Sequence, residues 1–174
     1  MSTPVRGPRG YYLIIRGPAA SGKTAVASRL GKLLDAHVVH FDTVLADHGL
    51  DRIVGEGIPA ENFIAGDLLL LEDVKRRLLR GRVVIIEACF YRPTHLDHLI
   101  RSLPFRHQVF SLRASLDTCI RRNRKRKTSL TPKDVADVYR LAAAFDAGIP
   151  IETEGRTVAE VADDIRSRLG EERR

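Results

Sequence analysis

The 174-residue sequence has few aromatic residues, 6% with no tryptophan, and only two cysteines. Cys89 and Cys119 are far apart in the chain and match no metal-binding or redox spacing, so neither kind of site is predicted for them. We expect a reduced, cytoplasmic setting. The apolar runs are far too short for a signal or membrane segment, and we expect no membrane partner.

Positive charge is plentiful and unevenly distributed. The formal net charge is +7, and residues 121–127 (RRNRKRK) alone carry six positive side chains. Arginine favours planar, bidentate contacts with phosphate, so this stretch fits a phosphate-handling segment. It also fits nucleic acid, but the scarcity of aromatic side chains leaves no platform on which bases could stack. Nucleic acid is therefore a disfavoured partner.

The length, with 44% hydrophobic and 29% charged residues, predicts one globular domain with a sizeable core. Short apolar runs alternate with helical patterns, which predicts an α/β fold: a five-stranded parallel sheet with helices on both faces. The expected strands are 11–15, 37–41, 82–88, 107–112 and 149–152. The domain is expected to span 11–169, between flexible segments 1–10 and 170–174.

The pattern weakens between Thr43 and about Gly66. Three glycines (49, 55 and 57) and Pro59 interrupt it, and regular helix resumes only near Leu68. An insertion of this kind, about 43–66, predicts a mobile cap over a site.

The most specific motif follows the first strand and opens a helix. Its residues are Gly17, Pro18, Ala19, Ala20, Ser21, Gly22, Lys23 and Thr24. Backbone amides of such a P-loop converge on phosphate at the N-terminus of the helix. Gly17 and Gly22 permit a close wrap that a Cβ would obstruct. Lys23 can reach the β- and γ-phosphates and Thr24 can ligate Mg²⁺, so the motif predicts nucleotide binding with a metal ion.

Two carboxylates follow expected strands. Asp42 is placed to accept a proton from, or orient, a hydroxyl that attacks a γ-phosphate, because the carboxyl ends of parallel strands lie beside the P-loop. It can instead cap a helix starting at Thr43 or join the Mg²⁺ shell, and Asp47 is an alternative acid. Glu87 can hold a metal-bound water, contact the substrate or form a salt bridge.

Other candidates lie near the same edge of the sheet. Tyr91 and Arg92 can line an acceptor site or simply begin the next helix. Arg122 and Arg126 would share one helical face at positions i and i+4, and an anion near them would explain that pairing of like charges. His95 and His98 lack a third ligand for a metal, so we expect surface positions for both.

Several segments together resemble a known family. They are GPAASGKT, the acid in HFDTV, the strand VVIIEACFY and the helix LRASLDTCIRRNRKR. From Tyr11 to about Leu169 the chain resembles small P-loop kinases of the AAA-domain branch. That branch groups with shikimate and gluconate kinases, zeta-toxin-like kinases, chloramphenicol phosphotransferase and polynucleotide 5′-hydroxyl kinases.

The resemblance implies a P-loop NTPase fold with an arginine-rich lid at about 121–131. It implies that Asp42 meets the acceptor hydroxyl and that Arg122 and Arg126 close over the transferred phosphate. It also places Gly155 and Arg156 beside the adenine. The expected function is an ATP- and Mg²⁺-dependent phosphotransferase acting on a hydroxyl of a small molecule. The alternatives are a polynucleotide 5′-hydroxyl kinase and a non-catalytic nucleotide-binding regulatory protein.

Overall fold

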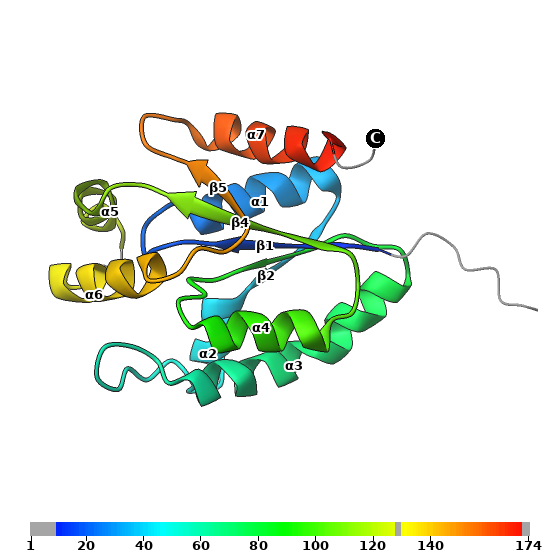
Figure 1. The fold of residues 1–174 in the computed structure, drawn as a ribbon, viewed down its shortest axis with the longest axis horizontal. Coiled ribbons are helices and arrows are strands. Elements are labelled where there is room, and N and C mark those ends of the chain that lie inside the picture. Colours follow the sequence, from blue (N-terminus) through cyan, green and yellow to red (C-terminus); the bar gives the residue numbers. More distant parts are fainter. Residues whose placement is uncertain (1–9, 128–129, 172–174) are drawn as a thin grey trace, which may run out of the picture.

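A computed structural model describes residues 10–127 and 130–171 and shows one parallel sheet between two layers of helices (Figure 1). The strands are β1 (Tyr12–Arg16), β2 (His37–His40), β3 (Val84–Glu87), β4 (His107–Arg113) and β5 (Ile149–Glu152). They lie in the order β2-β3-β1-β4-β5, and every pair is parallel. The predicted α/β fold with five parallel strands is confirmed.

Alternate residues of each strand serve the two faces of the sheet. Leu13 and Ile15 of β1 pack against α1 (Lys23–Leu34) and α7 (Val158–Glu171). Tyr12 and Ile14 face the other layer, formed by α2 (Phe41–Asp47), α3 (Ala60–Leu79), α4 (Pro93–Ser102) and part of α6 (Pro132–Ala143). Because both faces of β1 and β3 are buried, these two strands read as nearly continuous apolar runs, whereas β2, β4 and β5 are partly exposed and contain polar residues or proline. A smaller cluster joins α5 (Leu116–Asn123) to α6.

Half of the segment predicted as a cap is helical. Helix α2 follows β2 directly and α3 already begins at Ala60, so the loop between them covers only 48–59. Gly66 is buried inside α3 because a Cβ there would lie 2.7 Å from Leu45 Cδ2 and 2.9 Å from the Phe41 ring. The expectation that helix resumes near Leu68 is therefore wrong. Gly66 permits close packing of two helices and does not end one.

The predicted boundaries of the domain fall partly outside the described residues. Positions 1–9 and 172–174 lie there, as do 128–129 of the expected lid. Helix α7 runs to Glu171, beyond the expected boundary at 169. Among the described residues, no helix is long and apolar enough to cross a membrane.

Candidate functional site

The P-loop joins β1 to α1 in a conformation that requires its glycines. Gly22 is the N-cap of α1 with φ of 104°. Gly17 has φ of 150°, and a Cβ there would lie 2.6 Å from the Leu112 carbonyl oxygen and 2.9 Å from Ser21 Oγ. Lys23 Nζ donates to the Pro18 carbonyl at 2.9 Å and so lies folded over the loop. The predicted obstruction by a Cβ is present at Gly17, whereas at Gly22 a Cβ would meet nothing within 4 Å and the positive φ alone favours glycine.

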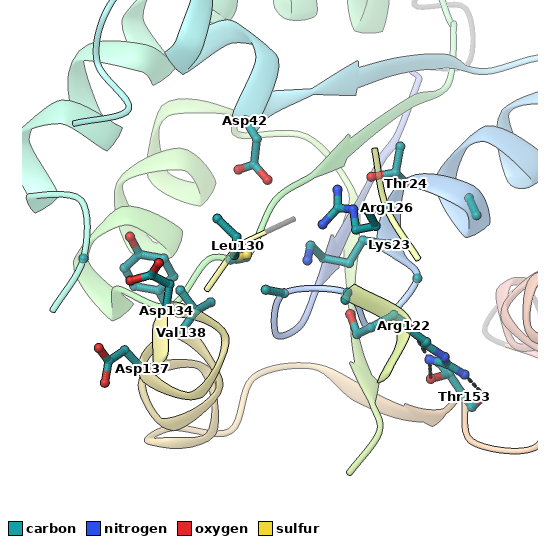
Figure 2. Close-up of a pocket in the computed structure, with 18 of the residues that line it drawn as sticks. Lys23, Thr24, Asp42, Arg122, Arg126, Leu130, Asp134, Asp137, Val138 and Thr153 are labelled. Atoms are coloured by element: carbon teal, nitrogen blue, oxygen red, sulfur yellow. Dashed lines mark hydrogen bonds between the residues drawn. The ribbon is translucent and has the colours of Figure 1, made fainter. Parts of the chain in front are cut away.

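The mouth of the P-loop opens into a cavity of about 670 Å³ (Figure 2). Most of the predicted site residues line it: Ala19, Ala20, Ser21, Gly22, Lys23, Thr24, Asp42, Tyr91, Arg122, Arg126 and Arg156. Five predicted residues do not: Gly17, Pro18, Glu87, Arg92 and Gly155. The 48–59 loop, part of the segment predicted to cover a site, also lines the cavity, but its acidic residues Asp51 and Glu56 were not singled out by the sequence. The contribution of α6, which includes Asp134 and Asp137, was not predicted at all. No motif marks these residues, because α6 is far from the P-loop in the chain.

Asp42 projects into the cavity from the first turn of α2, facing Lys23 and Arg126 (Figure 2). The N-cap of α2 is His40, so the alternative role of Asp42 as a cap is wrong. By surface area the side chain is exposed, because the cavity is open, but the carboxylate is recessed among protein atoms. The resulting desolvation raises its pKa, although Lys23 and Arg126 oppose the rise. Asp47 ends the same helix, is exposed and does not line the cavity.

Lys23 keeps its charge despite being buried. Burial alone lowers the pKa of its ammonium group, but Cys89, Asp42 and Glu87 together outweigh that effect, and the pKa is raised. A cation therefore faces the Asp42 carboxylate across the cavity at neutral pH. Cys89, for which the sequence predicted no function, lines the same space, and burial raises the pKa of its thiol to about 11.

Glu87 lies behind Thr24 at the floor of the site. Its Oε1 accepts hydrogen bonds from Thr24 Oγ1 at 3.0 Å and from His40 Nδ1 at 2.8 Å. Its Oε2 is buried and has no partner among the described residues. An unpaired buried carboxylate oxygen beside a threonine hydroxyl fits Mg²⁺, which binds oxygen atoms of one or two protein groups, phosphates and water. No group of three or more histidine, cysteine or acidic residues able to hold a metal occurs in the described part of the chain.

The two candidate arginines have different environments. Helix α5 ends at Asn123, so Arg126 is not on the same helical face as Arg122, and that prediction is wrong. Arg122 donates to the Ser21 carbonyl at 3.2 Å and to the Thr153 hydroxyl and carbonyl at 3.0 and 2.8 Å. It thereby joins the P-loop to the segment after β5. Arg126 follows α5 in a turn and reaches into the cavity (Figure 2).

Of the two neighbouring residues predicted to contact the acceptor, Tyr91 lines the cavity and Arg92 does not. The Tyr91 hydroxyl accepts a hydrogen bond from the Ile58 backbone at 2.7 Å, so Tyr91 anchors the 48–59 loop as well as lining the cavity. The Arg92 guanidinium lies 5.5 Å from the Tyr91 ring and does not line the cavity. Phe90, just before them, has φ of 44°, a strained conformation of the kind found at functional sites.

The segment after β5 forms the far wall beyond Arg122. Arg156 lines the cavity, but its guanidinium donates to Asp164 Oδ2 at 3.0 Å and to the carbonyls of Glu152 and Glu160. Gly155 lies in a turn with φ of 69° outside the cavity lining. Thr153, Thr157 and Val158 supply further lining atoms. The contact of Gly155 with a base therefore has no support in this geometry, and that of Arg156 stays a prediction.

The expected surface position is wrong for His95 and holds only in part for His98. His95 is fully buried, and its Nε2 donates to Asp67 Oδ1 at 3.0 Å. His98 is half-buried and donates from Nδ1 to Asp67 Oδ2 at 2.8 Å. The His95 ring stacks on Phe63 and Phe90 at centroid distances of 4.7 and 4.5 Å and contacts Phe41 at 4.9 Å. This cluster supports the start of α2, which carries Asp42.

Comparisons with solved structures show the same fold in three bacterial proteins. A sugar kinase from Janibacter sp. HTCC2649 has a TM-score of 0.74 at 16% identity, covering 94% of this chain and 95% of its own. The tunicamycin resistance protein of Deinococcus radiodurans has a TM-score of 0.69 at 21% identity, covering 93% and 96%. A gluconokinase from Sinorhizobium meliloti 1021 has a TM-score of 0.67 at 13% identity, covering 95% and 97%.

A search of curated protein sequences found no match. The sequence does match the AAA domain family over residues 13–146, which is most of the chain and includes the P-loop, Asp42, Glu87 and both candidate arginines. The resemblance inferred from the motifs is thus confirmed at the level of family and fold. The chain belongs to the AAA domain family and has the fold of the small P-loop kinases.

Proposed function

We propose that this protein is an ATP- and Mg²⁺-dependent phosphotransferase that moves the γ-phosphate to a hydroxyl of a small molecule. The observation that carries the proposal is the position of Asp42 on the cavity wall facing Lys23 and Arg126 (Figure 2). A P-loop alone also occurs in switches. A recessed carboxylate facing the phosphate-binding lysine supports transfer to an alcohol, since it can orient the hydroxyl and accept its proton.

Each remaining part of the site has a corresponding role. The triphosphate would lie on the backbone of the loop that ends at Gly22 and along Lys23. Thr24 and Glu87 would hold Mg²⁺. When bound, this ion neutralises part of the negative charge on the phosphates. Arg126 would stabilise negative charge on the transferred group, and Arg122 would keep the P-loop beside the nucleotide. Both cysteines are free, which supports a reduced, cytoplasmic setting.

The alternatives receive less support. A polynucleotide kinase needs a surface that accepts a phosphate backbone, but the cavity beyond Asp42 is lined by the carboxylates of Asp51, Glu56, Asp134 and Asp137. A regulatory nucleotide-binding protein has no need for a carboxylate at the position of Asp42. It would bind ATP tightly and release no ADP with any acceptor.

The test is ADP release in a coupled assay with a panel of sugars, nucleosides and amino alcohols. Asp42→Asn is expected to lower kcat by about 100-fold or more, because general-base catalysis contributes that much. Asp47→Asn, on the same helix but outside the cavity, is the matched control and should retain wild-type turnover. Lys23→Ala should abolish transfer. Full activity of Asp42→Asn would show that the proposed base is wrong.

A further inference from the structure

Charged side chains divide the cavity into two halves. Among its described lining residues, the cations come from α1, the α5 segment and the segment after β5: Lys23, Arg122, Arg126 and Arg156. The carboxylates come from α2, the 48–59 loop and α6: Asp42, Asp51, Glu56, Asp134 and Asp137. Figure 2 shows the division, with Asp134 and Asp137 on α6 across the cavity from Lys23 and Arg122. Phosphates belong in the first half, which leaves the acidic half to the acceptor.

The net charge of the protein does not explain this arrangement. The chain carries +7 overall, yet the acceptor half of its cavity has carboxylates and, beyond Arg126 at its border, no cation among the described lining residues. The acidity is therefore a local property of this wall. Like charges gathered on one wall of a cavity are costly unless something of opposite charge binds there.

Some of these carboxylates are neutralised from outside the cavity. Asp137 accepts hydrogen bonds from Lys133 at 2.5 Å and Arg140 at 2.9 Å, and Arg140 also donates to Glu56 at 3.1 Å. Neither cation lines the cavity. Because both are already paired, they are poorly placed to bind an anionic acceptor.

Besides Asp42, which faces Lys23 and Arg126, two carboxylates are left. Neither Asp51 nor Asp134 forms a salt bridge among the described residues, although Lys133 lies close enough to Asp134 to interact with it electrostatically. Asp134 accepts a hydrogen bond from the neutral Thr131 hydroxyl at 2.6 Å, and Asp51 has no hydrogen-bond partner in the described part of the chain. Apolar side chains lie beside them. Ile53 and Leu130 line the cavity, and their exposed fractions are 51% and 38%. The wall thus offers carboxylates for a cation and apolar surface for a carbon skeleton.

We propose, on the basis of the function proposed above, that the acceptor is a cationic hydroxyl compound such as an amino sugar, an aminocyclitol or an amino alcohol. Asp51 and Asp134 recognise its ammonium group, and Asp42 meets its hydroxyl. An ammonium gains charge-assisted hydrogen bonds from unpaired carboxylates. A sugar acid or sugar phosphate would instead bring like charge against them, which disfavours binding.

The test compares each amino compound with a neutral and an acidic counterpart of the same skeleton, for example glucosamine, glucose and glucuronate. ADP release is measured at saturating ATP and Mg²⁺. Binding to the complex with a non-hydrolysable ATP analogue is measured in parallel by ligand-observed NMR. The amino members should bind and react best, with a KM that rises as NaCl is raised to about 0.3 M, because salt screens partly exposed charges.

Two double variants separate recognition from general loss of charge. Asp51→Asn with Asp134→Asn should raise KM for the amino acceptor by about tenfold, the value of a hydrogen bond to a charged group, and leave kcat unchanged. Asparagine keeps an oxygen for the Thr131 hydroxyl, so the start of α6 is preserved. Asp47→Asn with Asp163→Asn removes the same charge from exposed positions outside the cavity and should change nothing.

The possible failures are distinguishable. Equal or stronger binding of the neutral or acidic member of each set overturns the inference about the acceptor, whether or not turnover is seen. In that case ATP binding and any Lys23-dependent transfer remain intact, and the proposed function stands. If the protein binds no ATP with Mg²⁺, the proposed function itself is wrong.

Discussion

Asp67 and His95 share a hydrogen bond of 3.0 Å between α3 and α4, and neither side chain has any solvent exposure. We expect Asp67→Ala to lower the free energy of unfolding by about 3 kcal/mol, because it leaves a buried polar partner unpaired. Urea denaturation measures the change. Asp73→Ala is the control on the same helix, since Asp73 is only partly buried and its ion pairs, with Arg76, Arg77 and His37, lie at the surface. It should cost less than about 1 kcal/mol. If both variants lost the same free energy of unfolding, the buried hydrogen bond would contribute no more to stability than the surface ion pairs.

Glu87 is expected to control the requirement for metal. Glu87→Gln keeps an oxygen for the Thr24 hydroxyl and removes the charge, so the Mg²⁺ concentration for half-maximal ADP release should rise by about tenfold or more. Chelation by EDTA should abolish turnover in the wild type. Glu72→Gln, on the exposed face of α3, is the control and should leave the Mg²⁺ titration unchanged. An unaltered titration for Glu87→Gln would remove Glu87 from the metal site.

The pH dependence of transfer should report the environment of Asp42. Burial raises the pKa of Asp42, so kcat/KM should fall with decreasing pH at a higher pH than an ordinary aspartate would give. Arg126 lowers that pKa, and Arg126→Gln should therefore move the acidic limb to still higher pH, apart from any loss of rate. Arg124→Gln, two positions away and outside the cavity, should leave the limb in place. An unshifted limb in Arg126→Gln argues against an electrostatic interaction between Arg126 and Asp42.

Thiol alkylation should distinguish the two cysteines. Cys89 lines the cavity with its pKa raised to about 11, so iodoacetamide should react slowly at pH 8 and about tenfold faster per pH unit as the thiolate forms. ATP with Mg²⁺ should slow the reaction by filling the cavity. Cys119 is fully buried and should stay unmodified in the folded protein. Mass spectrometry of tryptic peptides measures both sites, and fast labelling of Cys89 at pH 8 would contradict its placement.

The features that could be predicted from the sequence are those formed by neighbouring residues. The P-loop is one continuous strand-loop-helix segment, and its conformation follows from glycines at positions where other residues are strained. Strands β1 and β3 were equally readable, since burial on both faces favours nearly unbroken apolar runs. Because the carboxyl ends of parallel strands share one edge, Asp42 could also be assigned to the site before its contacts were known.

Predictions failed where the outcome depended on distant contacts. His95 was predicted to be a surface residue, but in the folded protein Asp67 and three phenylalanines surround it. Gly66 was expected to mark the end of an irregular segment, but it lies inside α3 and lets that helix pack on Phe41 and Leu45. Arg122 and Arg126 looked alike because helical spacing cannot show that α5 ends between them.

The sequence by itself determined the fold class, through the alternation of strand and helix patterns along the chain, and it determined the P-loop and the position of Asp42, because each of these two is encoded within a few consecutive residues. Only the tertiary structure decided which side chains complete the cavity. It brought the 48–59 loop and α6 to the side opposite the P-loop and so lined the acceptor half with carboxylates. That charge division arises from packing between segments far apart in the chain, and no local pattern records it.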